Sequence, residues 1–254
     1  MSDAPQLLIV ADKSAPWTDA VMALSAPHRR TLVIAPDTEI KTSAVEVVVG
    51  APPDLAAIIP RCPQLRWVQS TWAGIDAIAH FASEALQITP LKGVFGPAMT
   101  EYVMGWLLAI ERNVISRASH TQWTPSLEPR ITGKRLGIMG TGGIGTAIAV
   151  AARSFGVEVI GLNSDGRAVV GFSACYPSTD RLAFAEGLDY LVSVLPQTSQ
   201  TDKLIDHEVL MRLNPRAIVI NAGRGNAAVE LDLIASLNAG HVRAAVLDVF
   251  REEP

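Results

Sequence analysis

Cysteine, aromatic residues and long apolar runs are all scarce in this chain of 254 residues. The two cysteines, Cys62 and Cys175, are far apart in sequence, and no Cys/His spacing of a metal site surrounds them. We interpret them as reduced thiols, with a disulfide as the alternative. No stretch approaches the ~20 apolar residues that a membrane span requires. The apolar run near the N-terminus is also too short for the core of a secretory signal, so we expect a soluble cytoplasmic protein.

An excess of positive charge is absent as well. The chain has 21 Lys and Arg against 25 Asp and Glu, which gives a net charge of −4. Nothing in this balance attracts nucleic acid or an anionic membrane, and we expect neither as a partner. Hydrophobic residues make up 49% and charged residues 18%, a composition typical of a folded globular protein. The length suits one large domain or two modest ones.

Short apolar runs alternate with helical patterns along the chain. Most of these runs are apolar almost throughout, as in strands that are buried on both faces, which indicates a parallel sheet covered by helices on both sides. The alternation predicts an α/β fold. The predicted strands are Leu7–Val10, Thr31–Ala35, Val45–Gly50, Leu65–Gln69, Arg135–Met139, Glu158–Leu162, Tyr190–Leu195, Ala217–Asn221 and Ala244–Val249.

A boundary near Gly93–Pro97 divides the chain into two predicted domains, residues 1–96 and residues 97–254. A long helical pattern follows the boundary, and Pro97 suits its first position because the missing N–H would have no partner there. One face of this helix is apolar, which indicates core packing, a subunit interface, or both. The residues of this face are Met99, Tyr102, Val103, Trp106, Leu107, Ile110 and Val114.

One segment contains the pattern G-x-G-x-x-G, formed by Gly140, Gly142 and Gly145 around Gly143 and Ile144. The pattern alone is weak, but here it follows an apolar strand and opens an Ala-rich helix, the context of a dinucleotide site. Gly140 allows a tight turn, Gly142 lets the backbone approach a pyrophosphate, and Gly145 lets the helix pack closely. The helix N-terminus offers unpaired N–H groups and a positive dipole end to the phosphates. We therefore assign these five residues to a cofactor site.

The end of the next predicted strand bears on the choice of cofactor. A site selective for NAD has an acidic residue roughly 20 residues past the glycines to hold the ribose hydroxyls, and Asn163 occupies this place. Ser164 and Arg167 follow, and a hydroxyl and a guanidinium are suitable partners for a 2′-phosphate. We therefore predict NADP(H) in preference to NAD(H). Asp165 supports the alternative, since a shift of two residues would make it the NAD-type acid.

Several segments together resemble the D-2-hydroxyacid dehydrogenases, the family that includes glyoxylate/hydroxypyruvate reductases and D-3-phosphoglycerate dehydrogenases. The resemblance covers essentially the whole chain in the expected order. It implies a flavodoxin-like substrate domain over residues 1–96, a Rossmann dinucleotide-binding domain over residues 97–254, and a homodimer built around the helix that starts at Pro97. Besides the glycine pattern, the matching segments are Ser70–Asp76, Leu195–Thr198 with Thr201, Leu213–Pro215, Ile218–Gly225 and Ala244–Pro254.

By this resemblance the chain is an NAD(P)-dependent oxidoreductase. It would exchange a hydride between the nicotinamide and a small 2-oxo- or 2-hydroxyacid, with glyoxylate or hydroxypyruvate as the expected substrate. Phosphoglycerate is less suited, because the first domain shows no basic cluster for a phosphate. The alternative is a protein that senses NAD(P) without efficient catalysis, like the corepressors built on the same fold.

Arg224 is the predicted centre of the substrate site. It follows an apolar strand, at the edge where open α/β sheets bind ligands, and one guanidinium can bind the carboxylate and polarise the C2 oxygen of a 2-oxoacid. The resemblance implies that Asp248 contacts the nicotinamide amide and that Glu253 partners a catalytic histidine. A carboxylate beside a histidine favours the imidazolium, a general acid near neutral pH. Glu252 is the alternative partner for this histidine. We prefer Glu253, because it directly precedes Pro254.

The same resemblance places further residues in these two sites. Backbone N–H groups of the turn at Trp72, Ala73 and Gly74 are expected to bind the substrate carboxylate. Trp72 itself either forms a wall of the pocket or packs in the core. The remaining cofactor contacts are assigned to Leu195, Pro196, Thr201, Ala222 and Gly223. No metal site is expected.

The family's general acid, a histidine in a Pro-His turn, lies beyond Glu253, where this sequence ends at Pro254. We therefore expect the sequence to be part of a longer protein whose C-terminal part is missing, with loss of normal catalysis as the alternative. The five histidines that are present do not suit the role, because they fall in surface turns and at helix ends: His28, His80, His120, His207 and His241.

Overall fold

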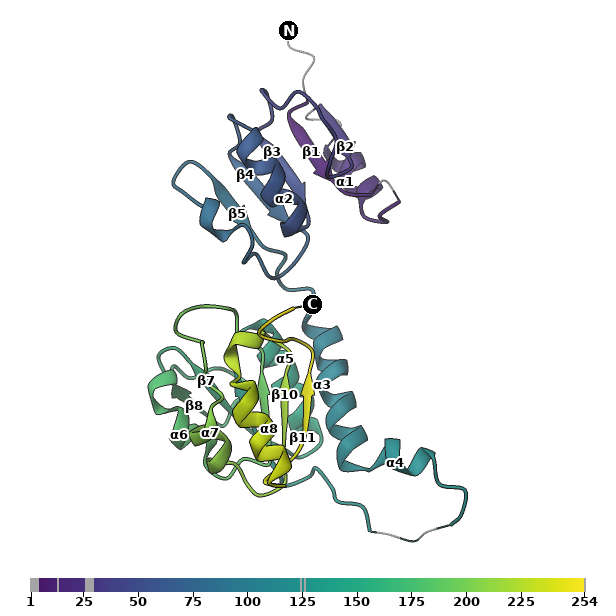
Figure 1. Ribbon diagram of the computed structural model, residues 1–254, viewed down its shortest axis with the longest axis vertical. Helices are drawn as coiled ribbons and strands as arrows, with labels where there is room; N and C mark the ends of the chain where they lie inside the picture. Colours follow the sequence, from purple (N-terminus) through teal and green to yellow (C-terminus); the bar gives the residue numbers. More distant parts are fainter. Residues whose placement is uncertain (1–4, 13, 26–29, 124, 126, 254) are drawn as a thin grey trace. The chain divides into compact units, whose positions relative to one another are not determined.

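The computed structural model describes residues 5–253 except 13, 26–29, 124 and 126. His28 and Pro254 therefore lie outside the described residues. The chain forms two compact units, Met1–Lys92 and Gly93–Pro254 (Figure 1). Each unit has its own sheet and its own core, and each is described by itself below. The assignment of residues 1–96 and 97–254 to a substrate domain and a dinucleotide-binding domain stays a prediction.

The first unit is a parallel sheet with helices on both faces. Its elements are β1 (Leu7–Val10), α1 (Thr18–Ser25), β2 (Thr31–Ile34), β3 (Val47–Gly50), α2 (Pro52–Ile58), η1 (Ile59–Arg61), β4 (Trp67–Ser70), η2 (Ala79–Phe81) and β5 (Gln87–Thr89). The strand order is β2-β1-β3-β4-β5, which is that of flavodoxin-like folds. β1 lies inside the sheet, with Leu7 opposite Thr31 on one side and Val47 on the other.

Alternate residues of β1 face two separate apolar clusters. Leu8 and Val10 pack with α2, whereas Leu7 and Ile9 pack with residues of α1. A strand that is buried on both faces must be apolar throughout, and all four residues of β1 are buried. The predicted α/β class with a helix-covered parallel sheet is confirmed for this unit.

The second unit is a larger parallel sheet of the same kind. Its elements are α3 (Gly96–Glu111), α4 (Val114–Ala118), β6 (Arg135–Met139), α5 (Gly143–Ser154), β7 (Glu158–Asn163), β8 (Ala174–Pro177), η3 (Ser178–Asp180), α6 (Arg181–Ala185), β9 (Tyr190–Ser193), α7 (His207–Arg212), β10 (Ala217–Asn221), η4 (Gly225–Ala227), α8 (Glu230–Asn238) and β11 (Val242–Leu247). The strand order is β11-β10-β9-β6-β7-β8. Renumbered from β6, this is the Rossmann order, so the predicted fold of this half is also confirmed.

Two apolar clusters cover the two faces of the second sheet. One contains residues of α3 and α5 together with Ile218 and Ile220 of β10. The other contains residues of α6, α7 and α8 together with Val219. Because neighbouring residues of a strand point to opposite faces, the layers are helix, sheet and helix. All carboxyl ends of the strands meet at one edge, and this edge carries the candidate site.

The long apolar helix differs from the prediction at both ends. It starts at Gly96, so Pro97 is its second residue, a position whose N–H also has no partner within a helix. It ends at Glu111, because Asn113 adopts φ 53 in the left-handed region. Val114, predicted on the same apolar face, therefore begins α4 and is 54% exposed.

Two strands were not predicted, and both are short. β5 and β8 lie at the edges of their sheets, and most of their residues are only partly buried or exposed. Edge strands have one neighbour and need little apolar sequence, so they lack the continuous apolar run of a central strand. Both cysteines are unpaired, and burial raises the pKa of the Cys62 thiol to about 11. Within the described residues, no helix is long and apolar enough to cross a membrane.

Candidate functional site

The glycine pattern forms a turn at the end of β6 and the start of α5. Gly140 adopts φ 104, a conformation that favours glycine. A side chain at Gly145 would overlap the carbonyl oxygen of Gly140, so α5 can pack this closely only with glycine there. A Cβ at Gly142 would meet no atom within 4 Å, so the backbone there borders open space. The turn therefore presents the N-terminus of a 12-residue helix to a space that an anion could fill.

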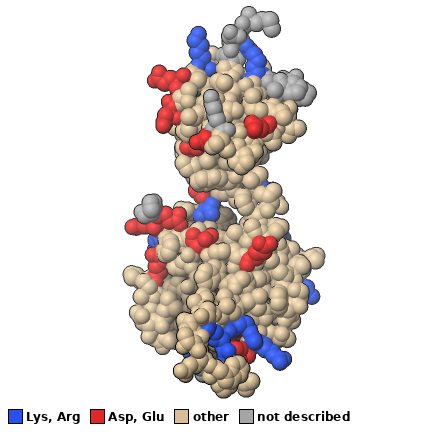
Figure 2. Space-filling view, turned by 90° about the vertical axis from the view of Figure 1, so that its right-hand side faces the viewer, with Lys and Arg blue, Asp and Glu red and all other residues tan. Residues whose placement is uncertain are grey.

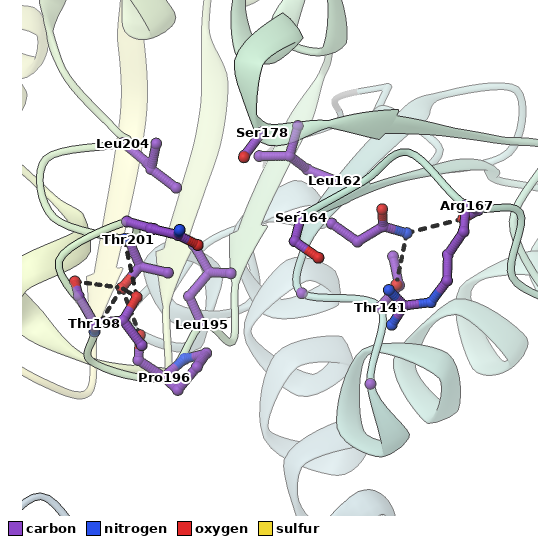
Figure 3. Close-up of a pocket in the computed structure, with 14 residues that line it drawn as sticks. Thr141, Leu162, Ser164, Arg167, Ser178, Leu195, Pro196, Thr198, Thr201 and Leu204 are labelled. Atoms are coloured by element: carbon purple, nitrogen blue, oxygen red, sulfur yellow. Dashed lines mark hydrogen bonds between the residues drawn. The ribbon is translucent and has the colours of Figure 1, made fainter.

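A cavity of about 330 Å³ lies beside this turn (Figure 3). It is bordered by the carboxyl ends of β6, β7 and β9, where the strand order reverses, the usual ligand position in open α/β sheets. Predicted cofactor residues in its lining are Gly140, Gly142, Asn163, Ser164, Arg167, Leu195, Pro196 and Thr201. The residues that complete the lining are Thr141, Leu162, Ser178, Thr198, Gln200 and Leu204.

The remaining predicted cofactor residues lie elsewhere in the second unit. Gly143, Ile144 and Gly145 form the first turn of α5. Ala222 and Gly223 follow β10, and Asp248 follows β11. None of these six is among the lining residues of the cavity. Because β10 and β11 continue the sheet beyond β9, the last three stand further along the edge that holds the cavity.

Asn163, the last residue of β7, organises the turn that follows it. Its Nδ2 donates to Oγ1 of Thr141 at 3.1 Å and to the carbonyl oxygen of Arg167 at 2.9 Å. Its Oδ1 accepts from the backbone N–H of Gly166 at 2.7 Å. The side chain is buried. Two of these bonds hold the turn after β7, and the bond to Thr141 joins that turn to the glycine loop. Sequence position alone identified Asn163 but could not show that its amide is engaged inside the protein.

Ser164, Asp165 and Arg167 are exposed on the outer side of the same turn. Nη1 of Arg167 lies 2.9 Å from Oδ1 of Asp165, an ion pair between two exposed side chains. In Figure 3 the Arg167 side chain extends from the turn toward Thr141 at the glycine loop. The lining of the cavity therefore includes the guanidinium of Arg167, and this guanidinium pairs with the carboxylate of Asp165.

The loop after β9 closes the other side of the cavity. Oγ1 of Thr201 donates to the carbonyl oxygen of Pro196 at 2.7 Å and accepts from the backbone N–H of Thr198 at 2.9 Å. These bonds fold residues 196–201 into a compact turn. Thr198 and Gln200, which line the cavity, were not assigned to it from the sequence, although Thr198 belongs to a matching segment. Ser178 was missed because it follows β8, a strand that was not predicted.

Arg224 stands in the turn after β10. Asn221 holds this turn, since its Nδ2 donates to the carbonyl oxygen of Arg224 at 3.0 Å. Nη1 of the half-buried Arg224 donates to the carbonyl oxygen of Gly223 at 2.8 Å. A Cβ at Gly223 would lie 2.6 Å from the backbone of Leu195, so glycine lets the turn approach the cavity loop.

The segment after β11 carries the other predicted acidic residues. The backbone N–H of Asp248 donates to the carbonyl oxygen of Asn221 at 3.0 Å, which places Asp248 beside the Arg224 turn. Burial raises the pKa of Tyr102 on α3, and the Asp248 carboxylate raises it further by accepting a hydrogen bond from that hydroxyl. Oε1 of Glu253 accepts from the backbone N–H of Phe250 at 2.7 Å, so the carboxylate folds back on its own segment. Glu252 is exposed.

The predicted substrate turn belongs to the first unit and follows β4. Ser70 shapes it, because its Oγ accepts from the N–H of Trp72 and donates to the carbonyl oxygen of the same residue, at 2.9 and 3.0 Å. The N–H of Thr71 donates to Gly50. Within the described residues, no hydrogen bond uses the N–H groups of Ala73 or Gly74. Trp72 is 52% exposed, so it is not a core residue of this unit.

Four histidines fall within the described residues. His80 belongs to η2 of the first unit, and His120 follows α4. His207 begins α7, where its backbone N–H donates to Asp232 at 2.8 Å. His241 precedes β11, at the amino end of the strand, and its Nε2 lies 3.0 Å from the carbonyl oxygen of Leu210. His241 is thus at the edge of the sheet opposite to that of Arg224.

Comparisons with known proteins agree with this geometry. The family model for the D-isomer specific 2-hydroxyacid dehydrogenase NAD binding domain matches residues 104–254. The chain is 32% identical to a D-3-phosphoglycerate dehydrogenase of Mycobacterium tuberculosis over 98% of its own length and 49% of that protein. It therefore spans about half the length of such curated relatives.

Two solved structures are similar to this chain over nearly its whole length. One is a D-isomer specific 2-hydroxyacid dehydrogenase family protein from Aeromonas salmonicida, with TM-score 0.88, 33% identity, and coverage of 98% of this chain and 82% of that chain. The other is an NADPH-dependent glyoxylate/hydroxypyruvate reductase from Sinorhizobium meliloti in complex with NADP and sulfate. Its TM-score is 0.82 at 27% identity, with 98% of this chain and 82% of that chain covered.

Proposed function

Because this chain belongs to the D-isomer specific 2-hydroxyacid dehydrogenase family, we propose that it reduces a small 2-oxoacid, glyoxylate or hydroxypyruvate, with NADP(H) as the hydride carrier. The observation that carries the proposal is the series of groups along one edge of the second sheet. The cavity lies at the ends of β7, β6 and β9, Arg224 follows β10, and Asp248 follows β11. A dinucleotide site is thus continued by a guanidinium and a carboxylate.

The residues around the cavity fit a nicotinamide dinucleotide. The open space at Gly142 and the N-terminus of α5 suit a pyrophosphate. Ser164 and Arg167 would hold a 2′-phosphate, since charge-assisted bonds from a guanidinium to a phosphate are strong. Asp165 already pairs with Arg167, so the preference for NADP(H) over NAD(H) is modest. The NADPH-dependent reductase among the similar structures supports this choice.

The substrate contacts would come from side chains and amides of this chain. The reduced nicotinamide, when bound, supplies the hydride. Arg224 would bind the carboxylate of the 2-oxoacid and polarise its C2 carbonyl, because a fixed guanidinium stabilises the negative charge that develops on the oxygen. In the first unit, the backbone N–H groups of Ala73 and Gly74 would be donors for a substrate carboxylate. Glu253 would favour the charged form of the family's proton-donating histidine.

We also propose that the chain forms a homodimer through α3 and the segment after it. Trp106 on α3 and Val114 and Ile115 on α4 expose large apolar surfaces. The side of the second unit that carries α3 faces the viewer in Figure 2. Its middle is largely uncharged, and Lys and Arg side chains gather at its lower end. A second copy of the chain would cover this surface. Light scattering at micromolar concentration should give twice the mass of one chain, and the mass of a single chain would reject the dimer.

The proposed activity is tested by glyoxylate-dependent oxidation of NADPH, with Arg224→Ala as the variant. Loss of one such electrostatic group lowers turnover by roughly 10²–10³-fold. We expect kcat/KM to fall by at least that factor, while the Kd for NADPH, measured by tryptophan fluorescence, stays within about twofold of wild type. An Arg224→Ala protein with wild-type kcat/KM would show that this guanidinium does not hold the substrate.

A further inference from the structure

Arg251 joins the segment after β11 to two other loops. Its Nη1 lies 3.0 Å from Oδ1 of Asp202, and its Nη2 donates to the carbonyl oxygen of Asn226 at 2.7 Å. Its backbone N–H donates to Oε1 of Glu230 at 2.8 Å. One residue thus makes three hydrogen bonds to segments that are 21 to 49 residues away in sequence.

Each of these loops carries a residue of the proposed site. Asp202 directly follows Thr201, which lines the cavity. Asn226 is two residues after Arg224, and Arg251 is two residues before Glu253. The guanidinium of Arg251 therefore connects the loop of residues 196–202, the turn after β10 that carries Arg224, and the segment after β11 that carries the acidic residues.

The three loops are also packed directly on one another. The backbone N–H of Lys203 donates to the same Asn226 carbonyl oxygen at 2.9 Å. A Cβ at Gly225 would overlap the backbone between Phe250 and Arg251. Because the loops are in direct contact, a small displacement of one loop shifts the other two. The planar guanidinium of Arg251 can donate hydrogen bonds to Asp202 and Asn226 at the same time. The ammonium group of a lysine is less suited to this geometry.

We propose that Arg251 is a positioning residue that couples nucleotide binding in the cavity to the placement of residues 248–253. The proposal rests on the proposed function, since a nucleotide must occupy the cavity. A ligand that contacts residues 196–201 restrains the loop that carries Asp202. Arg251 passes this restraint to the segment with Asp248 and Glu253, so that the two carboxylates are ordered when the nucleotide is bound.

The test is hydrogen exchange of the whole chain with 2′-phospho-ADP-ribose, which fills a dinucleotide site but has no nicotinamide to contact Asp248. In wild type, we expect the nucleotide to slow exchange at least about threefold both in residues 196–205 and in residues 249–253. In Arg251→Gln, residues 196–205 should keep this protection and residues 249–253 should lose it. Arg251→Lys should restore only part of the loss.

Two further variants separate coupling from general damage. Asp202→Ala removes the acceptor of the same contact from residues 196–202 and should also remove the protection of residues 249–253. The double variant should lose no more protection than either single variant. Arg212→Gln breaks an exposed ion pair with Glu186 at 2.9 Å and should behave as wild type. Undiminished protection of residues 249–253 in Arg251→Gln would overturn the coupling. Absence of protection at both segments in wild type would instead refute nucleotide binding itself.

Discussion

Alanine at Gly145 should destabilise the second unit and weaken NADPH binding at the same time. The added Cβ would overlap the carbonyl oxygen of Gly140, a backbone atom that cannot rotate away as a flexible side chain can. Relief requires either that α5 moves off the sheet or that the glycine turn changes shape. Overpacking of this kind costs roughly 1–3 kcal/mol, and each kcal/mol lowers Tm by roughly 2–4 °C in a protein of this size. We therefore expect a Tm lower by roughly 2–12 °C.

Gly142→Ala is the matched control, because it adds the same methyl group three residues earlier in the same turn. Its Cβ would meet no atom within 4 Å, so the free energy of unfolding should fall by at most about 1 kcal/mol. It would nevertheless fill the space that we assign to the pyrophosphate. Loss of one hydrogen bond to a charged group costs about 1.5–3 kcal/mol, so the Kd for NADPH should rise roughly tenfold to hundredfold.

Thermal unfolding by circular dichroism and NADPH titration by tryptophan fluorescence measure the two effects separately. Gly145→Ala should change both quantities, whereas Gly142→Ala should raise the Kd with a stability loss of at most about 1 kcal/mol. A Gly145→Ala protein as stable as wild type would refute the packing argument. A Gly142→Ala protein with wild-type affinity would show that no phosphate occupies the open space.

Arg167→Ala should raise the Kd for NADPH by one to two orders of magnitude, because a charge-assisted contact is worth about 1.5–3 kcal/mol. The Kd for NADH should stay nearly unchanged. If fluorescence titrations show the same rise in Kd for both cofactors, Arg167 does not bind the 2′-phosphate. Burial alone would raise the pKa of Asp189, but hydrogen bonds from the Arg135 backbone, Lys134 and Asn214 hold it below its ordinary value. The stability that this carboxylate contributes is therefore complete above pH 3.8, the ordinary pKa, and is lost as the pH falls through the lower folded value. Urea unfolding should thus show Asp189→Asn less stable than wild type near neutral pH and a smaller difference in acid, and a difference that grows in acid would reverse the assigned direction.

The elements that the sequence predicted well are those whose pattern is set by burial. β1 and β10 are buried on both faces and are apolar throughout, so their bounds were predicted correctly. The glycine turn was equally recognisable, since Gly140 adopts a backbone conformation that favours glycine and Gly145 allows α5 to approach the Gly140 carbonyl. The edge strands β5 and β8 lacked such a pattern, because only one neighbour and a partly buried surface constrain their residues.

Contacts between loops that are distant in sequence could not be predicted. Asn163 stood at the expected position, but only the structure shows that its amide bonds Thr141 and the turn after β7. Arg251 had no recognisable role in the sequence, since its partners Asp202 and Asn226 are brought to it by the fold. The periodicity of apolar residues in the sequence indicates which residues are buried. It does not indicate which loops lie together at the edge of a sheet.

The central claim is that a hydride passes from the reduced nicotinamide to C2 of a small 2-oxoacid held by Arg224. The direct test is to incubate the protein with glyoxylate and NADPH deuterated on the transferred side of nicotinamide C4, and to look for deuterium in the glycolate formed. An end-point measurement accumulates product even when proton transfer is slow. We predict deuterium at C2 of glycolate with wild type and much less with Arg224→Ala at equal nucleotide occupancy. The account would be contradicted if NADPH binds but no deuterium appears in glycolate, or in glycerate when hydroxypyruvate is supplied. The protein would then be a nucleotide-binding protein without this activity.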